Sequence, residues 1–134
     1  MDLGIKDKTA LVLGGGGGLG GAIAQSLARE GVKVVVADLN LDAATATADG
    51  ITAQGQSAVA LQWDLRALDA FDSQVAWIEA NVGPVDILVN NTGGPPPTPS
   101  SGQQADLWRE HFEGMVLSVI KLTDRILPGM RERQ

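Results

Sequence analysis

Short apolar runs alternate with stretches of helical periodicity along the whole chain. Four runs rich in Val, Leu, Ala and Ile predict buried strands, at residues 9–13, 33–38, 58–64 and 85–90. Between them, apolar residues recur every three or four positions, which predicts helices at residues 19–28, 41–54 and 67–82. A last helix is expected from Asp106, as its N-cap, to the region of Pro128. This alternation predicts an α/β fold with a doubly wound parallel sheet of about four strands.

The segment between the last strand and the last helix has a different composition. It reads "NTGGPPPTPSSGQQ", which excludes a helix or a central strand there and predicts a loop. The rest of the chain contains no internal repeat and no change of composition that would mark a second domain. We therefore expect residues 1–134 to form one domain.

Composition narrows the classes of function. The net charge of −6 argues against a nucleic-acid partner, which would need a basic face. The chain has no cysteine, so thiolate metal sites and thiol catalysis are excluded, and a reducing cytoplasm is the expected location. Residues 9–28 are uncharged, but seven of these residues are glycines, which argues against a membrane-spanning helix.

Five consecutive glycines, at residues 14–18, lie between the first strand and the first helix. Gly15, Gly17 and Gly20 match G-x-G-x-x-G, whereas Gly14, Gly18 and Gly20 match G-x-x-x-G-x-G. Glycine lets a backbone approach a phosphate closely, and the N-terminus of a helix offers free N–H groups to it. A Walker A loop is excluded because Gly21 stands where its lysine would be. The run predicts a pyrophosphate-binding turn, and a tight turn without a ligand is the alternative.

Two carboxylates are expected at neighbouring strand ends. Asp38 ends the second strand, 18 residues after Gly20, where a dinucleotide-binding unit places an acid to bind the ribose hydroxyls. Such a carboxylate repels a 2′-phosphate, and no Lys or Arg follows it closely, so NAD is favoured over NADP. Asp64 ends the third strand near the expected adenine position. The alternatives are a solvated carboxylate at Asp38 and a helix N-cap at Asp64.

The segment "VDILVNNTGG" resembles the N-N-A-G segment of the short-chain dehydrogenase/reductase family, with Thr92 replacing the usual alanine. The family's T-G-x-x-x-G-x-G falls on Leu13 to Gly20, and the ketoacyl-carrier-protein-reductase-like members are the most similar. The resemblance implies a Rossmann-type sheet that binds a nicotinamide dinucleotide and a small carbonyl or alcohol substrate. The cofactor-binding residues that it implies are Gly14, Gly18, Leu19, Gly20, Asp38, Leu39, Asp64, Leu65, Asn90, Asn91 and Gly93.

Two departures from the family pattern concern catalysis. The family's active-site asparagine in the long helix falls on Met115, whose thioether cannot hold a proton-relay water as an amide does. The family's catalytic Ser and Tyr-x-x-x-Lys belong to segments beyond Gln134, and this chain contains no tyrosine. A phenol is needed to protonate the carbonyl oxygen during hydride transfer. The sequence therefore predicts a cofactor site without a general acid, and we expect His111 to lie on a solvated or interface face.

Three functions remain open from the sequence. The first is an oxidoreductase chain that binds a nicotinamide dinucleotide without being competent for turnover by itself. The second is a methyltransferase that uses S-adenosylmethionine, although "ALVL" lacks the acid that such enzymes place before the glycines. The third is a non-catalytic interaction module. In the first and third, the apolar helix at residues 106–127 and an unpaired fourth strand predict a homo-oligomer.

Overall fold

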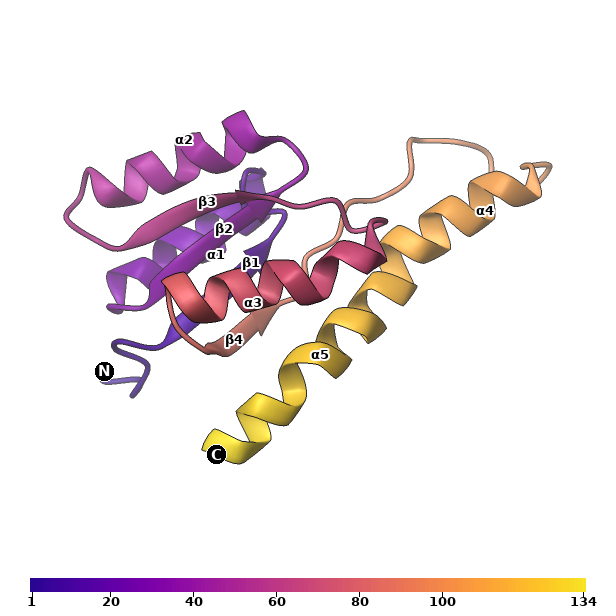
Figure 1. Ribbon diagram of the computed structural model, residues 1–134. Coiled ribbons are helices and arrows are strands. Elements are labelled where there is room, and N and C mark those ends of the chain that lie inside the picture. Colours follow the sequence, from indigo (N-terminus) through magenta and orange to yellow (C-terminus); the bar gives the residue numbers. More distant parts are fainter.

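The computed structural model describes residues 1–134 and contains one parallel sheet with the strand order β3-β2-β1-β4 (Figure 1). Its strands are β1 (Thr9–Leu13), β2 (Lys33–Asp38), β3 (Ala58–Gln62) and β4 (Val85–Val89). The predicted α/β class and number of strands are confirmed. As expected, β4 is an edge strand, and it pairs with β1 alone.

The helices follow the predicted order with some different ends. They are α1 (Gly18–Arg29), α2 (Leu41–Thr52), α3 (Phe71–Asn81), α4 (Ala105–Phe112) and α5 (Ser118–Arg133). A short 3₁₀ helix, η1 (Leu68–Ala70), precedes α3, and a π-helical segment, η2 (Glu113–Leu117), joins α4 to α5. The predictions for α2 and β3 ran two residues too far, at the end of an element where local sequence signals are weakest.

Helices cover both faces of the sheet, which makes three layers (Figure 1). On one face, alanines of α1 and α2 pack on alternate residues of β1 and β2 such as Val12 and Val36. On the other face, α3 and α5 pack through Val75, Ile78 and Leu122. Because β1 and β2 are buried on both faces, they read as continuous apolar runs in the sequence.

Leu19 is the one large apolar side chain of helix α1 that does not pack against the core. Leu19 is 70% exposed, whereas Gly20, Gly21, Ala24 and Ala28 form the buried face. Small residues let the helix axis come close to the sheet directly after the glycine turn. The N-terminus of α1 is thereby held beside the carboxyl end of β1.

The last helix departs from the prediction at its start. Asp106 lies inside the first turn of α4, and Gln104 is the N-cap residue. The side chain of Gln104 makes no capping hydrogen bond. Glutamine is not among the residue types preferred at an N-cap, so the sequence did not indicate where α4 begins. In Figure 1, α4 projects beyond the sheet, and α5 continues its direction across the sheet's face.

The predicted end near Pro128 is also wrong, because α5 continues through this proline to Arg133. A proline removes one backbone hydrogen bond, to the carbonyl group of Asp124. Both residues are exposed, so water can satisfy that carbonyl. Arg133 then ties the last turn to β4, with its Nη2 donating to the carbonyl oxygen of Val85 at 2.7 Å.

Arg125 joins the two helices on this face of the sheet. Its guanidinium group pairs with Asp72 and Glu79 of α3, with Nε–Oδ1 and Nη1–Oε1 distances of 2.5 and 3.3 Å. The hydrogen bond to Glu79 is the largest cause that raises the pKa of Arg125 above its ordinary value, and the hydrogen bond to Asp72 is the second. The guanidinium group of Arg125 therefore stays charged at every physiological pH. No helix in the structure is both long enough and apolar enough to cross a lipid bilayer.

Candidate functional site

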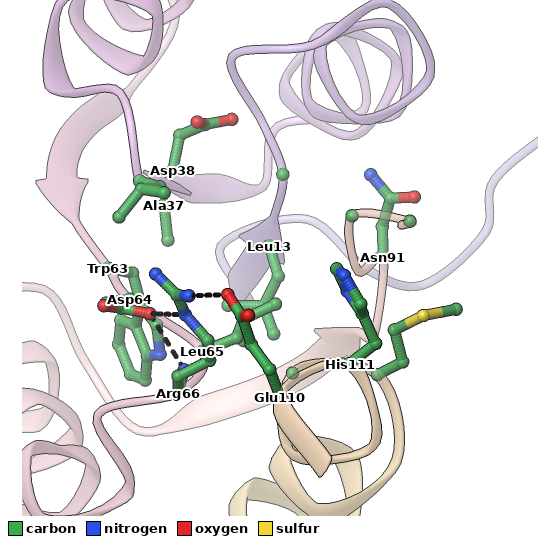
Figure 2. A pocket seen from close by; sticks show the side chains of 16 residues that line it. Leu13, Ala37, Asp38, Trp63, Asp64, Leu65, Arg66, Asn91, Glu110 and His111 are labelled. Carbon is green, nitrogen blue, oxygen red and sulfur yellow. Dashed lines mark hydrogen bonds and ion pairs between the residues drawn. The ribbon is translucent and has the colours of Figure 1, made fainter. Parts of the chain in front are cut away.

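A cavity of about 290 Å³ opens at the carboxyl ends of β1, β2 and β3 and reaches α4 (Figure 2). It brings together seven of the eleven residues that the resemblance implies: Gly14, Asp38, Leu39, Asp64, Leu65, Asn91 and Gly93. Gly18, Leu19, Gly20 and Asn90 lie outside its lining. Ligands of doubly wound sheets bind at this edge, where the strand order reverses between β1 and β4.

Glycines of the turn are required by the fold itself, Gly14 and Gly20 among them. Gly14 has a φ of +63°, and a Cβ atom there would lie 2.7 Å from Nδ2 of Asn91. A Cβ atom on Gly20 would lie only 2.1 Å from the carbonyl oxygen of Gly14. The amide of Asn91 packs on both positions, so the end of β4 supports the turn from outside the sheet.

Gly18, by contrast, is not required by any contact of the fold. A Cβ atom there would meet nothing within 4 Å. The N–H groups of Gly18, Leu19 and Gly20 donate no hydrogen bond to the protein, and the N-cap, Gly17, has no side chain to bond them. The first turn of α1 therefore presents free donors and a partial positive charge beside open backbone.

The carboxylate of Asp38 fastens this turn to the end of β2. Its Oδ2 accepts a hydrogen bond from the N–H group of Gly16 at 2.9 Å, and its Oδ1 accepts one from that of Asn40 at 3.0 Å. Each oxygen retains a lone pair for a further donor. Asp38 is thus half-buried and oriented, rather than a freely solvated side chain.

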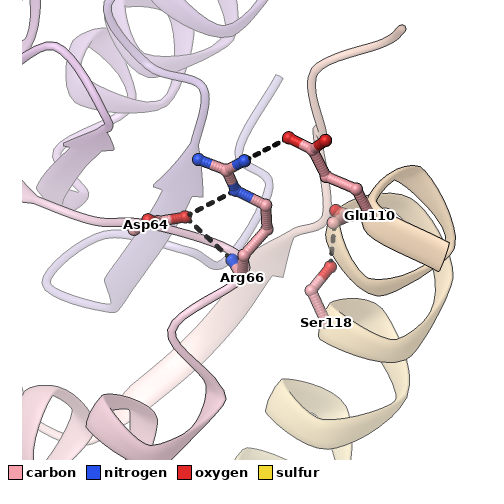
Figure 3. Close-up of polar contacts among 5 residues, drawn as sticks. Asp64, Arg66, Glu110 and Ser118 are labelled. Atoms are coloured by element: carbon pink, nitrogen blue, oxygen red, sulfur yellow. Dashed lines mark hydrogen bonds and ion pairs between the residues drawn. The ribbon is translucent and has the colours of Figure 1, made fainter. Parts of the chain in front are cut away.

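Asp64 is not the N-cap of a helix, because η1 begins later and its N-cap residue is Ala67. Its Oδ1 accepts a hydrogen bond from the N–H group of Arg66 at 2.9 Å and lies 3.4 Å from Nε of the same residue. Arg66 also pairs through Nη1 with Oε1 of Glu110 in α4 (Figure 3). These three side chains connect the end of β3 to α4 across the cavity.

Trp63 forms the floor beside this group. It is 2% exposed, and its ring packs on Phe71 with the centroids 5.6 Å apart. Its Nε1 is the one buried side-chain nitrogen or oxygen in the structure without a hydrogen-bond partner. The three tryptophans form no stacking platform, because Trp77 and Trp108 lie on separate exposed surfaces.

Asn90 and Met115, two residues singled out by the resemblance, have different surroundings. Asn90 is exposed and donates from Nδ2 to Oγ1 of Thr123 at 3.3 Å, which ties β4 to α5. Met115 lines the cavity from η2. The role that the resemblance gives Asn90 in cofactor binding therefore stays a prediction.

His111 is half-buried, which the sequence did not indicate. It lies in the wall between the first cavity and a second one of about 420 Å³, which is lined by the proline-rich loop and by Trp108 and Phe112. The neighbouring residues Arg109, Glu110 and Glu113 are exposed, and their charges made the whole segment look solvated in the sequence.

Sequence reasoning also missed Arg66, Glu110 and Gly114 as residues of the cavity. Arg66 and Glu110 are 44 positions apart, and no local pattern marks either of them. Gly114 lies in η2, where the hydroxyl of Ser118 donates to its carbonyl oxygen at 2.8 Å (Figure 3). The only available signal was the position of Arg66 two residues after a candidate ligand-binding aspartate.

Residues 8–134 match the family described as short chain dehydrogenase. The 7alpha-hydroxysteroid dehydrogenase of Escherichia coli (strain K12) is 35% identical over 131 residues, which make up 98% of this chain and 51% of that protein. The ketoacyl reductase HetN of Nostoc sp. (strain PCC 7120) is 31% identical over 129 residues, or 96% of this chain and 45% of that protein. The chain spans about half the length of these curated relatives.

Solved structures agree with the sequence relatives. The crystal structure of hydroxysteroid dehydrogenase from Escherichia coli superposes with a TM-score of 0.88 at 35% identity and covers 96% of this chain and 55% of its own. The structure of L-sorbose reductase from Gluconobacter frateurii, complexed with NADPH and L-sorbose, has a TM-score of 0.91 at 29% identity. It covers 99% of this chain and 51% of its own. The similarity therefore includes the whole sheet and its helices.

Proposed function

Because the chain belongs to the short-chain dehydrogenase family, we propose that it binds NAD at the carboxyl edge of its sheet. The adenosine half would occupy the cavity between Asp38 and Asp64, and the pyrophosphate would lie on the first turn of α1. The observation that carries this proposal is the set of three unpaired N–H groups beside the open backbone of Gly18. A pyrophosphate is the ligand that such a turn suits.

The preference for NAD over NADP rests on charge. Asp38 and Leu39 line the cavity at the end of β2, and the four residues after Asp38 include no Lys or Arg. A 2′-phosphate on the ribose would meet the carboxylate of Asp38 without a compensating cation. The L-sorbose reductase is complexed with NADPH, so family membership alone does not decide between the two cofactors.

The chemistry that a bound nicotinamide supplies is hydride transfer to or from a small carbonyl or alcohol compound. This chain offers residues that bind and orient the cofactor, but it has no tyrosine to act as the general acid, and Met115 occupies the asparagine position. We therefore propose that the 134-residue chain binds the dinucleotide without turning over a substrate. The alternative, a non-catalytic interaction module, predicts no nucleotide binding.

Titration with NADH, followed by nicotinamide fluorescence and by calorimetry, tests the proposed function. We expect saturable binding of NADH, weaker binding of NADPH, and no heat with S-adenosylmethionine, since only a dinucleotide matches both carboxylates and the turn. Failure to bind NADH and NADPH would refute the proposal and favour the interaction module. Binding of S-adenosylmethionine alone would favour the methyltransferase.

A homo-oligomer through the helix at residues 106–127 is also proposed. Five large apolar side chains lie exposed along α4, η2 and the start of α5: Trp108, Phe112, Met115, Val116 and Ile120. Steps of three or four residues, with Met115 and Val116 adjacent to each other, place them on one side of the helix. A contiguous apolar surface of this kind is typical of a protein interface.

We expect light scattering at micromolar concentration to give at least twice the monomer mass of 13.9 kDa. Ile120→Glu should return the mass to that of the monomer, because it places a charge in the apolar surface. Lys121→Ala, one position away on the exposed side of α5, should not change the mass. A monomeric mass for the unmodified protein would refute this interface.

A further inference from the structure

Arg66 occupies an unusual position for a surface arginine, because its side chain crosses the cavity. Its Nε lies 3.4 Å from Oδ1 of Asp64, and its Nη1 pairs with Oε1 of Glu110 on the opposite wall (Figure 2). One end of the guanidinium plane is therefore held by the end of β3 and the other by α4. Both anchors line the cavity themselves.

The side chain of Arg66 passes beside Gly114 of η2. A Cβ atom on Gly114 would lie 3.6 Å from Cγ of Arg66, so the hydrocarbon stem of Arg66 passes along the backbone of η2. That distance is an ordinary van der Waals contact, so η2 flanks the stem of Arg66. The arrangement thus consists of the arginine and its two anchors, Asp64 and Glu110.

Stability does not account well for these ion pairs. The side chains of Arg66, Asp64 and Glu110 are 45%, 39% and 48% exposed. Pairs with such exposure are screened by water and contribute little to folding. The position of the pairs across a cavity, rather than on a plain helix surface, points instead to a role toward a ligand.

Arg66 also supplies positive charge to a cavity whose other charged lining residues are carboxylates. Three carboxylates line it, those of Asp38, Asp64 and Glu110, and Arg66 is the only Lys or Arg among the lining residues. Arg66 therefore offsets part of the negative charge beside the proposed position of the adenosine half.

We propose that Arg66 is the adenine-contacting residue of this cavity, and that its guanidinium plane, held by Asp64 and Glu110, is the wall on which the adenine ring stacks. This proposal rests on the proposed function, since it assigns the contact partner of one half of the dinucleotide. A planar guanidinium stacks on aromatic faces, whereas the ammonium group of lysine does not. Glu110 acts through Arg66 as a positioning residue.

Binding measurements with two fragments of the cofactor test this assignment. ADP-ribose contains the adenine and lacks the nicotinamide, whereas reduced nicotinamide mononucleotide lacks the adenine. We expect Arg66→Ala to weaken the binding of NADH and of ADP-ribose by about tenfold, the effect of one stacking contact of this kind. Binding of reduced nicotinamide mononucleotide should not change, because that fragment does not reach Arg66.

Two further variants separate stacking from charge. Arg66→Lys keeps the charge and loses the plane, so it should weaken ADP-ribose binding nearly as much as Arg66→Ala does. Glu110→Gln removes one anchor and should give a smaller loss. Circular dichroism and thermal unfolding check that each variant remains folded, as the exposure of these side chains predicts.

Unchanged or tighter binding of ADP-ribose to Arg66→Ala would overturn the assignment, and tighter binding would mean that Arg66 obstructs the cavity. An equal loss for both fragments would overturn it as well, since it would indicate a general effect on charge or fold. Absence of NADH, ADP-ribose and NADPH binding to the unmodified protein would refute the proposed function itself. Failure of the proposed function is thus seen in the unmodified protein, whereas failure of the Arg66 assignment is seen as a variant that binds as well as the unmodified protein does.

Discussion

Replacing Gly20 by alanine is expected to lower the free energy of unfolding by about 3 kcal/mol or more, the upper range for an overpacked site. The added Cβ atom would lie 2.1 Å from the carbonyl oxygen of Gly14 and 2.9 Å from Nδ2 of Asn91. The first neighbour is backbone and cannot move freely, and the amide of Asn91 also packs on Gly14. For a chain of this size, the loss corresponds to a fall in melting temperature of about 10 °C.

Gly18→Ala is the matched control, in the same turn and with the same added atom. Its Cβ atom would meet nothing within 4 Å, so the melting temperature should stay within the range of a neutral surface substitution. NADH binding should nevertheless weaken by more than about tenfold, since the methyl group would occupy the place proposed for the pyrophosphate. Stability and binding would then separate at two positions only two residues apart.

Unaltered NADH binding by Gly18→Ala would contradict the placement of the pyrophosphate. An unaltered melting temperature of Gly20→Ala would contradict the expected loss of stability, because it would show that the turn can shift enough to accommodate the added Cβ atom. Thermal unfolding followed by circular dichroism, together with NADH titration of both variants, gives all four values.

The second large effect is expected at Asp38. Asp38→Ser should weaken NADH binding by about ten- to a hundredfold, because hydrogen bonds from the ribose hydroxyls to a charged acceptor are lost. The same change should strengthen NADPH binding, because the 2′-phosphate no longer meets a carboxylate. The preference between the two cofactors would then reverse.

Asp42→Ser is the control for this experiment. Asp42 lies in the first turn of α2, is exposed and is absent from the cavity, so its loss changes the net charge equally without changing the site. Its ratio of NADH to NADPH affinity should remain that of the unmodified protein. Equal weakening of both cofactors by Asp38→Ser would instead assign Asp38 a purely structural role, through its hydrogen bond to Gly16.

The order of elements was predictable because it depends on local patterns. The apolar run of β1 lies between charge and glycine, and that of β2 lies between Lys33 and Asp38, so the parallel sheet followed from the sequence. Where neighbouring elements decide the outcome, the predictions were wrong. Leu19 belongs to an apolar stripe and is exposed, and Pro128 lies inside a helix whose last turn Arg133 holds against β4.

The sequence by itself determined the class of fold, the glycine turn, and the carboxylates of Asp38 at the end of β2 and Asp64 two residues after β3, since each depends on residues adjacent in the chain. Only the tertiary structure separated the glycines that the fold requires, Gly14 and Gly20, from Gly18, which it leaves open. It alone also joined Arg66 to Glu110 across the cavity. The physical reason is the same in both cases: a contact between residues far apart in the chain exists only after the strands and helices have packed.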